Sequence, residues 1–320
     1  MKFIGILVGH SVKLIMVILF QQAAAFELKW REGERAPSKI DRPCDAVIIG
    51  TAAYFRGGGT KKIYSYDISS DKWSQLLDTP FDSCTLAVVN NLLTTIGGSS
   101  PLTNELFSLT GQGKNKRWTK EFPPMPTKRQ RTIALCSKKA LIVAGGDKGE
   151  TLRTVEIMNT ETLTWSTVAD LPQELRVASA TITGGHLYIL GGVPDNWTGT
   201  HAVYTCSVSA LIRSCSGSAS SSDVWERIAD IPVTWATCVS VQNRVLAVGG
   251  RQPNGNFSTT VHMYDPDTNF WQVISHMSVA RRQCFAVVLS TTRALMVVGG
   301  WSATTGNRID SVELASIIKE

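Results

Sequence analysis

The sequence predicts an all-β fold in which six four-stranded units close into a single propeller. An apolar run that ends in a pair of glycines occurs six times, as in "ALMVVGG" at 294–300. The last glycines of these pairs lie 39 to 58 residues apart. A repeat of about 50 residues is expected of a propeller blade, whereas solenoid units are shorter. A tryptophan recurs between successive pairs, at Trp73, Trp118, Trp165, Trp225 and Trp271.

The first 25 residues differ from the rest of the chain. They begin with a basic residue, Lys2, contain a short apolar run at 14–20 and end in small residues at 23–25. This order is typical of a secretory signal peptide cleaved after Ala25, and the run is too short for a membrane span of about 20 residues. We therefore expect 1–25 to be a signal peptide and 26–320 to form one propeller in the secretory pathway. The alternative is a non-domain leader on a cytoplasmic protein.

The composition is that of a globular protein, with 43% apolar and 18% charged residues. A formal net charge of +6 without a basic run does not indicate a nucleic-acid binder. Two sequons, at Asn196 and Asn256, favour secretion.

The chain has seven cysteines, and most of them point away from a disulfide framework. Five lie at a similar place ahead of a glycine pair, which predicts small apolar fillers of equivalent buried positions. They are Cys44, Cys84, Cys136, Cys238 and Cys284. The other two, Cys206 and Cys215, are close enough in sequence for a local disulfide.

Each unit contains four candidate strands, and the third unit shows them best. Its strands are expected at 131–137, 140–146, 154–160 and 164–172, with turn-forming residues between them. The first two are apolar throughout, as expected of inner strands that are buried on both faces. Glycines at the end of the second strand permit positive φ and close approach, and we expect the tryptophan of the fourth strand to be the large neighbour that needs this space.

The two ends of the sequence complement each other. The sixth unit ends at its third strand, and no tryptophan strand follows it. The segment after residue 25 supplies a tryptophan, Trp30, without strands before it. We expect this segment to be the outer strand of the last blade, which closes the ring and removes an open edge.

The repeat resembles the kelch motif, in which a double glycine precedes a strand that ends in a Tyr-Asp pair and then a spaced tryptophan. The match is best at 245–271, which includes "VHMYDPDTNFW", and good at 64–73, "YSYDISSDKW". The second unit has "LFSLTG" in place of the Tyr-Asp pair, and the fourth carries a Ser-rich insert at 214–223. The resemblance implies a six-bladed kelch-type β-propeller with four antiparallel strands per blade.

The resemblance also implies a protein-binding role. Family members often serve ubiquitin ligases or bind actin, but the BTB and BACK regions that accompany those roles are not found in this sequence. We therefore expect a non-enzymatic module that binds a partner protein through loops on one face. The alternatives are a secreted or surface-tethered propeller that binds extracellular protein or glycan, and a propeller enzyme of unknown type.

The histidines give little support to an enzyme. They show no i,i+4 or H-x-E spacing. The Tyr, His and Cys set of a copper-radical oxidase and the repeated Asp boxes of a sialidase are not recognisable. We expect no catalytic residue, no metal and no cofactor.

Arginines recur in the loops that lead into the innermost strands. These loops converge on one face of a propeller, so residues far apart in sequence would form a ring. A ring of guanidinium groups suits carboxylates, which predicts an acidic segment in the partner. The alternative is solvated arginines paired with nearby acids such as Asp41 or Asp82. The expected ring consists of Arg42, Arg129, Arg131, Arg176, Trp235, Arg281 and Arg282.

By the resemblance, the loops after the glycine pairs end on the same face. They add Asp195, Trp197, Arg251 and Trp301 as candidate contacts. Exposed Trp and Arg are the residue types that dominate protein interfaces. Trp301 directly follows a glycine pair, so a packing role is equally consistent with its position.

Overall fold

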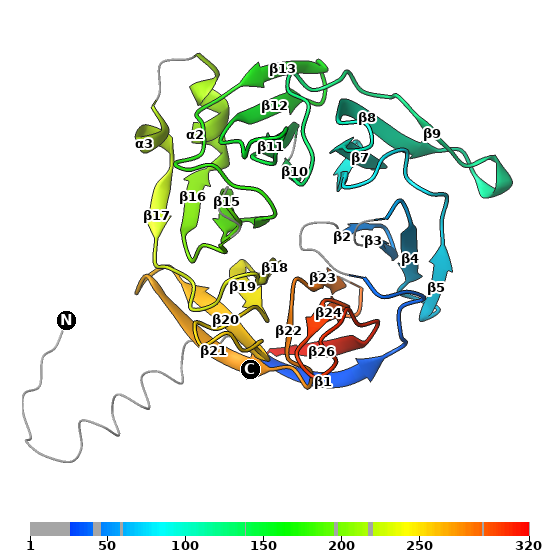
Figure 1. Ribbon diagram of the computed structural model, residues 1–320, viewed down its shortest axis with the longest axis vertical. Coiled ribbons are helices and arrows are strands. Elements are labelled where there is room, and N and C mark those ends of the chain that lie inside the picture. The colour runs from blue at the N-terminus through cyan, green and yellow to red at the C-terminus, as the bar shows by residue number, and fades with distance from the viewer. Residues whose placement is uncertain are drawn as a thin grey trace, which may run out of the picture.

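The chain folds into a ring of six four-stranded antiparallel sheets (Figure 1). The structure is a computed structural model that describes residues 26–40, 46–57, 60–137, 139–194, 198–216, 220–289 and 291–319. The first strand of each blade lies nearest the centre and the fourth lies at the rim. The predicted six-bladed propeller is confirmed.

The first three blades follow one another directly along the chain. Blade 1 contains β2 (Ala46–Ile49), β3 (Ala52–Arg56), β4 (Ile63–Asp67) and β5 (Lys72–Gln75). Blade 2 contains β6 (Thr85–Val89), β7 (Leu92–Gly98), β8 (Thr103–Thr110) and β9 (Arg117–Thr119), with the short helix η1 (Gly113–Asn115) before β9. Blade 3 contains β10 (Ile133–Ser137), β11 (Ala140–Ala144), β12 (Val155–Asn159) and β13 (Thr164–Thr167).

The other three blades include one helical insertion and the closing strand. Blade 4 contains β14 (Ser179–Thr183), β15 (His186–Leu190), β16 (Val203–Ser207) and β17 (Glu226–Ile228). Between its last two strands lie α2 (Val208–Arg213), η2 (Ser214–Ser216) and α3 (Ser221–Val224). Blade 5 contains β18 (Thr237–Val241), β19 (Arg244–Val248), β20 (Thr260–Asp265) and β21 (Phe270–His276). Blade 6 contains β23 (Phe285–Leu289), β24 (Ala294–Val298), β26 (Val312–Lys319) and β1 (Phe26–Gly33).

Blade 6 is built from both ends of the described chain, as predicted. β1 pairs antiparallel with β26 over its whole length, from Phe26 opposite Lys319 to Gly33 opposite Val312 (Figure 1). The register places Phe26 and Leu28 in the core shared with blade 5. The 1–25 segment lies outside the described residues.

The core consists of wedges between neighbouring blades. Each cluster of buried apolar side chains joins two adjacent blades, for example Phe55 of blade 1 with Phe285 of blade 6. The recurring tryptophans join the same neighbours, because each indole N–H donates a hydrogen bond to the preceding blade or to the segment that leaves its outer strand. The donors and acceptors are Trp73 to Glu34, Trp118 to Asp78, Trp165 to Pro123, Trp225 to Ala169, Trp271 to Ala229, and Trp30 to the hydroxyl of Ser275.

The glycine pairs that the structure describes adopt positive φ as predicted, but the neighbour expected for them was wrong. Gly145 and Gly146 have φ of +60° and +92°. A Cβ on Gly145 would lie 2.2 Å from the carbonyl oxygen of Leu175, and a Cβ on Gly146 would lie 2.6 Å from that of Gln130. The space is therefore needed by the backbone of the loops that enter the inner strands, and the tryptophan lies elsewhere.

The cysteines occupy equivalent positions only in part. Cys84 and Cys284 are buried directly before the inner strand of their blades, whereas Cys238 is buried as the second residue of its inner strand. Cys136 is half-buried within β10, and Cys44 lies outside the described residues. Burial raises the pKa of the Cys238 thiol to about 12. The possible bridge does not form, because Cys206 and Cys215 are both free thiols. Of the helices in the described ranges, none has the length and apolar character to cross a bilayer.

Candidate functional site

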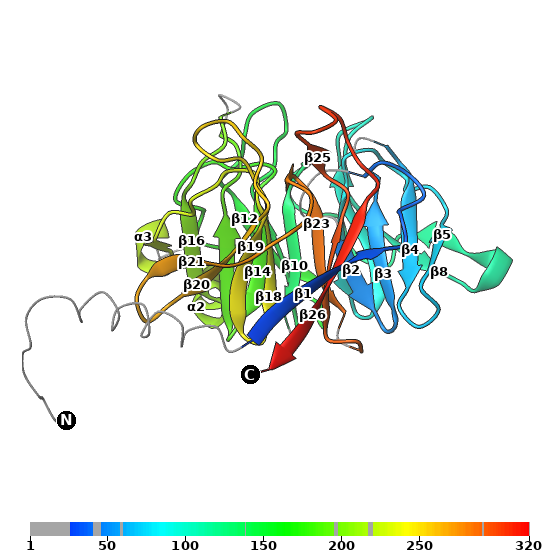
Figure 2. The same cartoon turned by 90° about the horizontal axis from the view of Figure 1, so that it is seen from below.

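The loops that enter the inner strands and the loops that follow the glycine pairs share one face. In several blades the two loops pair through a short β-bridge, as between Gln130 and Asp147 or between Thr234 and Arg251. In blade 6 the pairing extends into a two-stranded ribbon of β22 (Arg281–Arg282) and β25 (Trp301–Ser302). Figure 2 shows β25 among the loops at the top of the ring. We call this side the loop face.

Each loop that enters an inner strand, where the structure describes it, contains one residue with a left-handed backbone conformation. These residues lie at the inner edge of the loop face. These residues have φ between 51° and 58° although none is glycine. The amide of Arg131 donates to the carbonyl of Ser83, and the amide of Val177 donates to that of Arg131. A bulky residue at positive φ is uncommon and stays there only when its surroundings fix it. The residues are Ser83, Arg131, Val177, Trp235 and Gln283.

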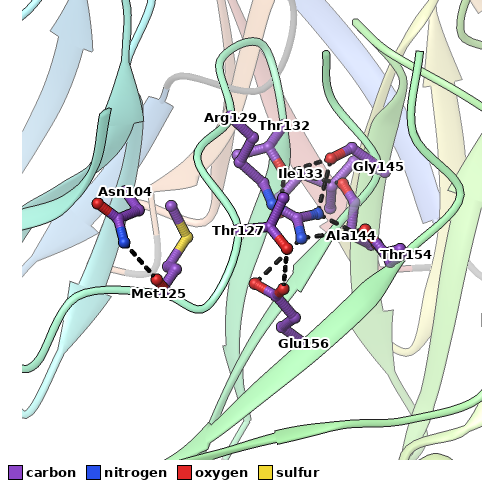
Figure 3. Close-up of polar contacts among 10 residues, drawn as sticks. All are labelled: Asn104, Met125, Thr127, Arg129, Thr132, Ile133, Ala144, Gly145, Thr154 and Glu156. Carbon is purple, nitrogen blue, oxygen red and sulfur yellow. Dashed lines mark hydrogen bonds and ion pairs between the residues drawn. The ribbon is translucent and has the colours of Figure 1, made fainter. Parts of the chain in front are cut away.

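Two arginines of the expected ring, Arg129 and Arg281, are not at the surface. Both are fully buried, with 0% of their area exposed. Figure 3 shows the Arg129 guanidinium beside Glu156, Gly145 and Thr154. Its Nη2 lies 3.0 Å from Glu156 Oε2, and its Nη1 donates to the carbonyl oxygen of Gly145 at 2.9 Å. The guanidinium thus joins the entry loop to the second and third strands of its own blade.

Arg281 repeats this arrangement in blade 6. Its Nη2 donates to Glu313 Oε1 at 2.7 Å, and its Nη1 donates to the carbonyl oxygen of Gly299 at 3.0 Å. Burial lowers the pKa of the Arg129 guanidinium, and the Glu156 carboxylate opposes this shift. The expectation that Arg129 and Arg281 reach a partner is corrected here, because both are structural groups beneath the loop face.

Six of the nine remaining members of the expected set fall into three groups. Arg42, Asp195 and Trp197 lie outside the described residues. Arg176 is buried, with 7% of its area exposed, and Arg131 is bound 3.2 Å from the carboxylate of Asp147. This ion pair fits the alternative of arginines held by nearby acids, although the acid is not one of those foreseen. Arg251 is exposed, and its Nε donates to the carbonyl of Gly255.

The other three expected residues, Trp235, Arg282 and Trp301, come together. The guanidinium carbon of Arg282 lies 5.7 Å from the ring centre of Trp235 and 5.7 Å from that of Trp301. Phe257 is a third ring at 5.0 Å, and the guanidinium carbon of Arg308 lies 5.6 Å from Trp301. All five side chains are half-buried. We call Trp235, Phe257, Arg282, Trp301 and Arg308 the aromatic–arginine cluster.

Sequence reasoning missed Phe257 and Arg308. Both lie on the returning arm of a loop that follows a glycine pair, and short bridges pair Phe257 with Arg251 and Arg308 with Trp301. The signal was present, because each lies six or seven residues after a candidate contact, a spacing that suits a tight return. The cluster combines cations held over aromatic faces, which can contact both apolar groups and carboxylates.

A cavity of about 60 Å³ lies among the inner strands, and its lining is mainly apolar, including Leu86, Ile133 and Phe285. Within the described ranges, no three His, Cys, Asp or Glu side chains gather as they would around a metal ion. The aromatic–arginine cluster makes the loop face a candidate site.

Comparisons with known proteins agree with this geometry. A family model for the Kelch motif matches residues 134–172 and 236–278, which fall in blades 3 and 5. Kelch-like protein 35 of Mus musculus is 25% identical over 322 residues, covering 86% of this chain and 54% of its own length. Kelch-like protein 25 of Xenopus tropicalis is 22% identical over 298 residues, covering 83% of this chain and 47% of its own. The chain thus spans about half the length of these relatives.

A solved structure gives the same result for the fold. The structure of YjhT superposes with a TM-score of 0.69 and 15% identity, covering 89% of this chain and 99% of YjhT. At this identity the likeness concerns the fold alone. The motif matches, the Kelch-like relatives and the six registered repeats support a kelch-repeat family for this chain.

Proposed function

We propose that the propeller is a non-enzymatic protein-binding module whose loop face recognises an acidic segment of a partner protein. The observation that carries the proposal is the aromatic–arginine cluster, in which Arg282 lies among three rings. Stacked guanidinium groups still present N–H donors at their edges, and these suit carboxylates. The kelch fold and the Kelch-like relatives support a protein-binding role in general terms.

The test compares cluster variants with matched variants on the rim. Phe257→Ala and Arg308→Ala, singly and together, are expected to reduce partner binding about tenfold or more, because truncation of an interface anchor costs about 2 kcal/mol or more. Phe270→Ala and Arg227→Ala are the controls, because both residues are exposed on outer strands. Partners would be recovered by affinity purification with mass spectrometry and then measured individually against each variant.

The acidic character of the partner is tested separately. Binding should weaken as salt rises, because exposed charges are screened over about 8 Å at physiological ionic strength. Neutralising the acidic residues of the recovered partner should reproduce the loss seen with Arg308→Ala. If the folded double variant retains every partner, the cluster is not the binding site. If partners are lost but binding is insensitive to salt, the acidic segment is refuted and the protein-binding role stands.

An extracellular setting is the second candidate, favoured by the sequon at Asn256. Its side chain is exposed in the loop that follows the glycine pair of blade 5, next to Phe257 of the cluster. A glycan there would stand beside the proposed contact surface and restrict access to it. A mature N-terminus at Phe26 and a glycosidase-sensitive shift that disappears in Asn256→Gln would support secretion. An unprocessed N-terminus without glycan would support the cytoplasmic setting.

A further inference from the structure

A groove separates blades 3 and 4 at the end of the propeller opposite to the loop face. Its volume is about 720 Å³, within the range of about 300 to 1,000 Å³ that small-molecule sites occupy. One wall is formed by the outer strands β12 and β13 and by the turn before β11. The other wall is formed by the β14–β15 turn and by α2, which lies low in the ring in Figure 2.

The groove lies where blade 4 differs from blade 1. In blade 1 the fourth residue of the third strand is Tyr66, whose hydroxyl donates to Asp71 in a short turn and fills the space next to the neighbouring blade. The equivalent residue of blade 4 is Cys206, opposite Leu187 as Tyr66 is opposite Ala53. A thiol is much smaller than a phenol, and the short turn is replaced by the helical insertion. α2 fills part of the space and leaves the rest open.

The lining has an apolar floor and a polar, weakly basic rim. Ile157 and Val208 are buried in the floor, and Ile212 leaves 40% of its area exposed. Hydroxyl groups of Ser166, Ser207 and Ser209 line the same groove. Among the lining residues that the structure describes, Lys139 is the one Lys or Arg and none is Asp or Glu. Lys139 Nζ lies 2.5 Å from Glu161 Oε1, but both groups are largely exposed, and such pairs contribute about 0 to 1 kcal/mol.

We propose that this groove binds a small amphipathic organic anion. Its apolar body would cover Ile157, Val208 and Ile212, and its acidic group would lie beside Lys139 with the serine hydroxyls as further hydrogen-bond donors. Covering Ile212 removes exposed apolar area from water, which favours binding by about 25 cal/mol per Å². The site is independent of the loop face, so it stands or falls separately from the proposed function.

The first test is titration of the folded protein with anilinonaphthalene sulfonate, an apolar body with one anionic group, measured by fluorescence and by calorimetry. We expect saturable binding with one site. Ser166→Trp, which fills the groove from β13, should weaken binding at least tenfold. Ser74→Trp is the matched control, because Ser74 follows the tryptophan of blade 1 as Ser166 follows that of blade 3. Equal binding by both variants, or none by the parent protein, would overturn the proposal.

The second test starts from the unmodified chain, so its main measurement does not depend on whether a variant folds. Cys215 is an exposed thiol that lines the groove. Saturating decanoate should slow its reaction with a disulfide reagent at least fivefold, whereas decanol, which lacks the acidic group, should protect less. Lys139→Gln should remove the difference between decanoate and decanol. Loss of this reaction in Cys215→Ser would show that the measured thiol is that of Cys215. An unchanged rate with decanoate would overturn the proposal, and equal protection by both compounds would overturn its anionic part.

Discussion

Blade 2 and blade 3 fill the same internal position with opposite chemistry. In blade 3, Arg129 of the entry loop meets Glu156, the second residue of the third strand. In blade 2, Phe81 stands at the place of Arg129, two residues before the left-handed residue of the loop. Its ring lies 5.8 Å from that of Phe107 on the third strand. Blade 6 repeats the ion pair with Arg281 and Glu313.

This comparison teaches that the fold requires a matched pair at this position rather than a particular chemistry. The backbone frame is the same, because Val143 faces Glu156 in blade 3 and Thr95 faces Phe107 in blade 2. A buried ion pair gains little over well-packed apolar groups, but a single unpaired charge is costly. The two members must therefore change together.

The largest expected effect is the loss of one acid. Glu313→Ala leaves Arg281 buried without its counter-ion and removes the acceptor of the Ser278 and Val279 amides. We expect the free energy of unfolding to fall by about 3 to 5 kcal/mol. Glu156→Ala should cost less, because Glu156 accepts from Arg129 and from the Thr127 hydroxyl but from no backbone amide in the described contacts. Urea denaturation of both variants checks the order, and a reversed order would contradict the comparison.

The next effect is a loss of stability at low pH. It concerns the strand position of blade 5 that corresponds to Glu156 of blade 3. His262 occurs there, and burial, assisted by His276, lowers its pKa to about 4. The unfolded chain binds the proton near pH 6.5 and the folded chain near pH 4, so stability falls as pH drops through this interval. We expect a loss of about 2 to 3 kcal/mol at pH 4. His262→Tyr, which copies Tyr204 of blade 4, should remove this part of the acid sensitivity. Denaturation at pH 7 and pH 4 measures it, and equal acid losses in both proteins would refute it.

A smaller net effect is expected when both members of a pair are replaced. Arg129→Met with Glu156→Leu should return the protein to within about 1.5 kcal/mol of the parent, although either change alone costs about 3 kcal/mol or more. The carbonyls that Arg129 contacts keep other donors, since the Thr132 hydroxyl also donates to Gly145 and the Gly145 amide to Thr154. A double-mutant cycle gives the coupling energy. Simple additivity would show that the pair is not a unit.

The smallest effect should come from an arginine at the surface. Arg227 is bound to Asp230 on the rim, with 59% and 50% of their side chains exposed. Arg227→Ala should change the free energy of unfolding by less than about 0.5 kcal/mol. Thermal and urea unfolding of Arg227→Ala and of Glu156→Ala would show how the loss in free energy of unfolding differs between an exposed ion pair and a buried one.

The sequence determined the fold well because its strongest signals are backbone requirements. The glycine pairs, the spaced tryptophans and the unmatched Trp30 segment predicted six blades and their closure. The site was harder to predict, since Arg129 and Arg282 lie in equivalent loops and belong to the same residue type. The burial of Arg129 depends on Glu156 and that of Arg281 on Glu313, both on the third strand of the blade. This matching becomes visible only when the strands are in register. The groove likewise required the register that places Cys206 where Tyr66 lies in blade 1.

The closure of blade 6 also determines the side of the propeller from which the two ends of the described chain leave. Phe26 and Lys319 are partners in one antiparallel pair, so the two ends of the described chain leave from the same edge (Figure 2). That edge lies away from β25, which Figure 2 shows at the top of the ring, and from β22, which pairs with β25. A tether attached at either end of the described chain would therefore leave from the side opposite to the loop face, and the loop face would point away from the attachment. It also means that the chain is nearly a circle, and a cyclically permuted version with new ends between β12 and β13 should keep all six blades.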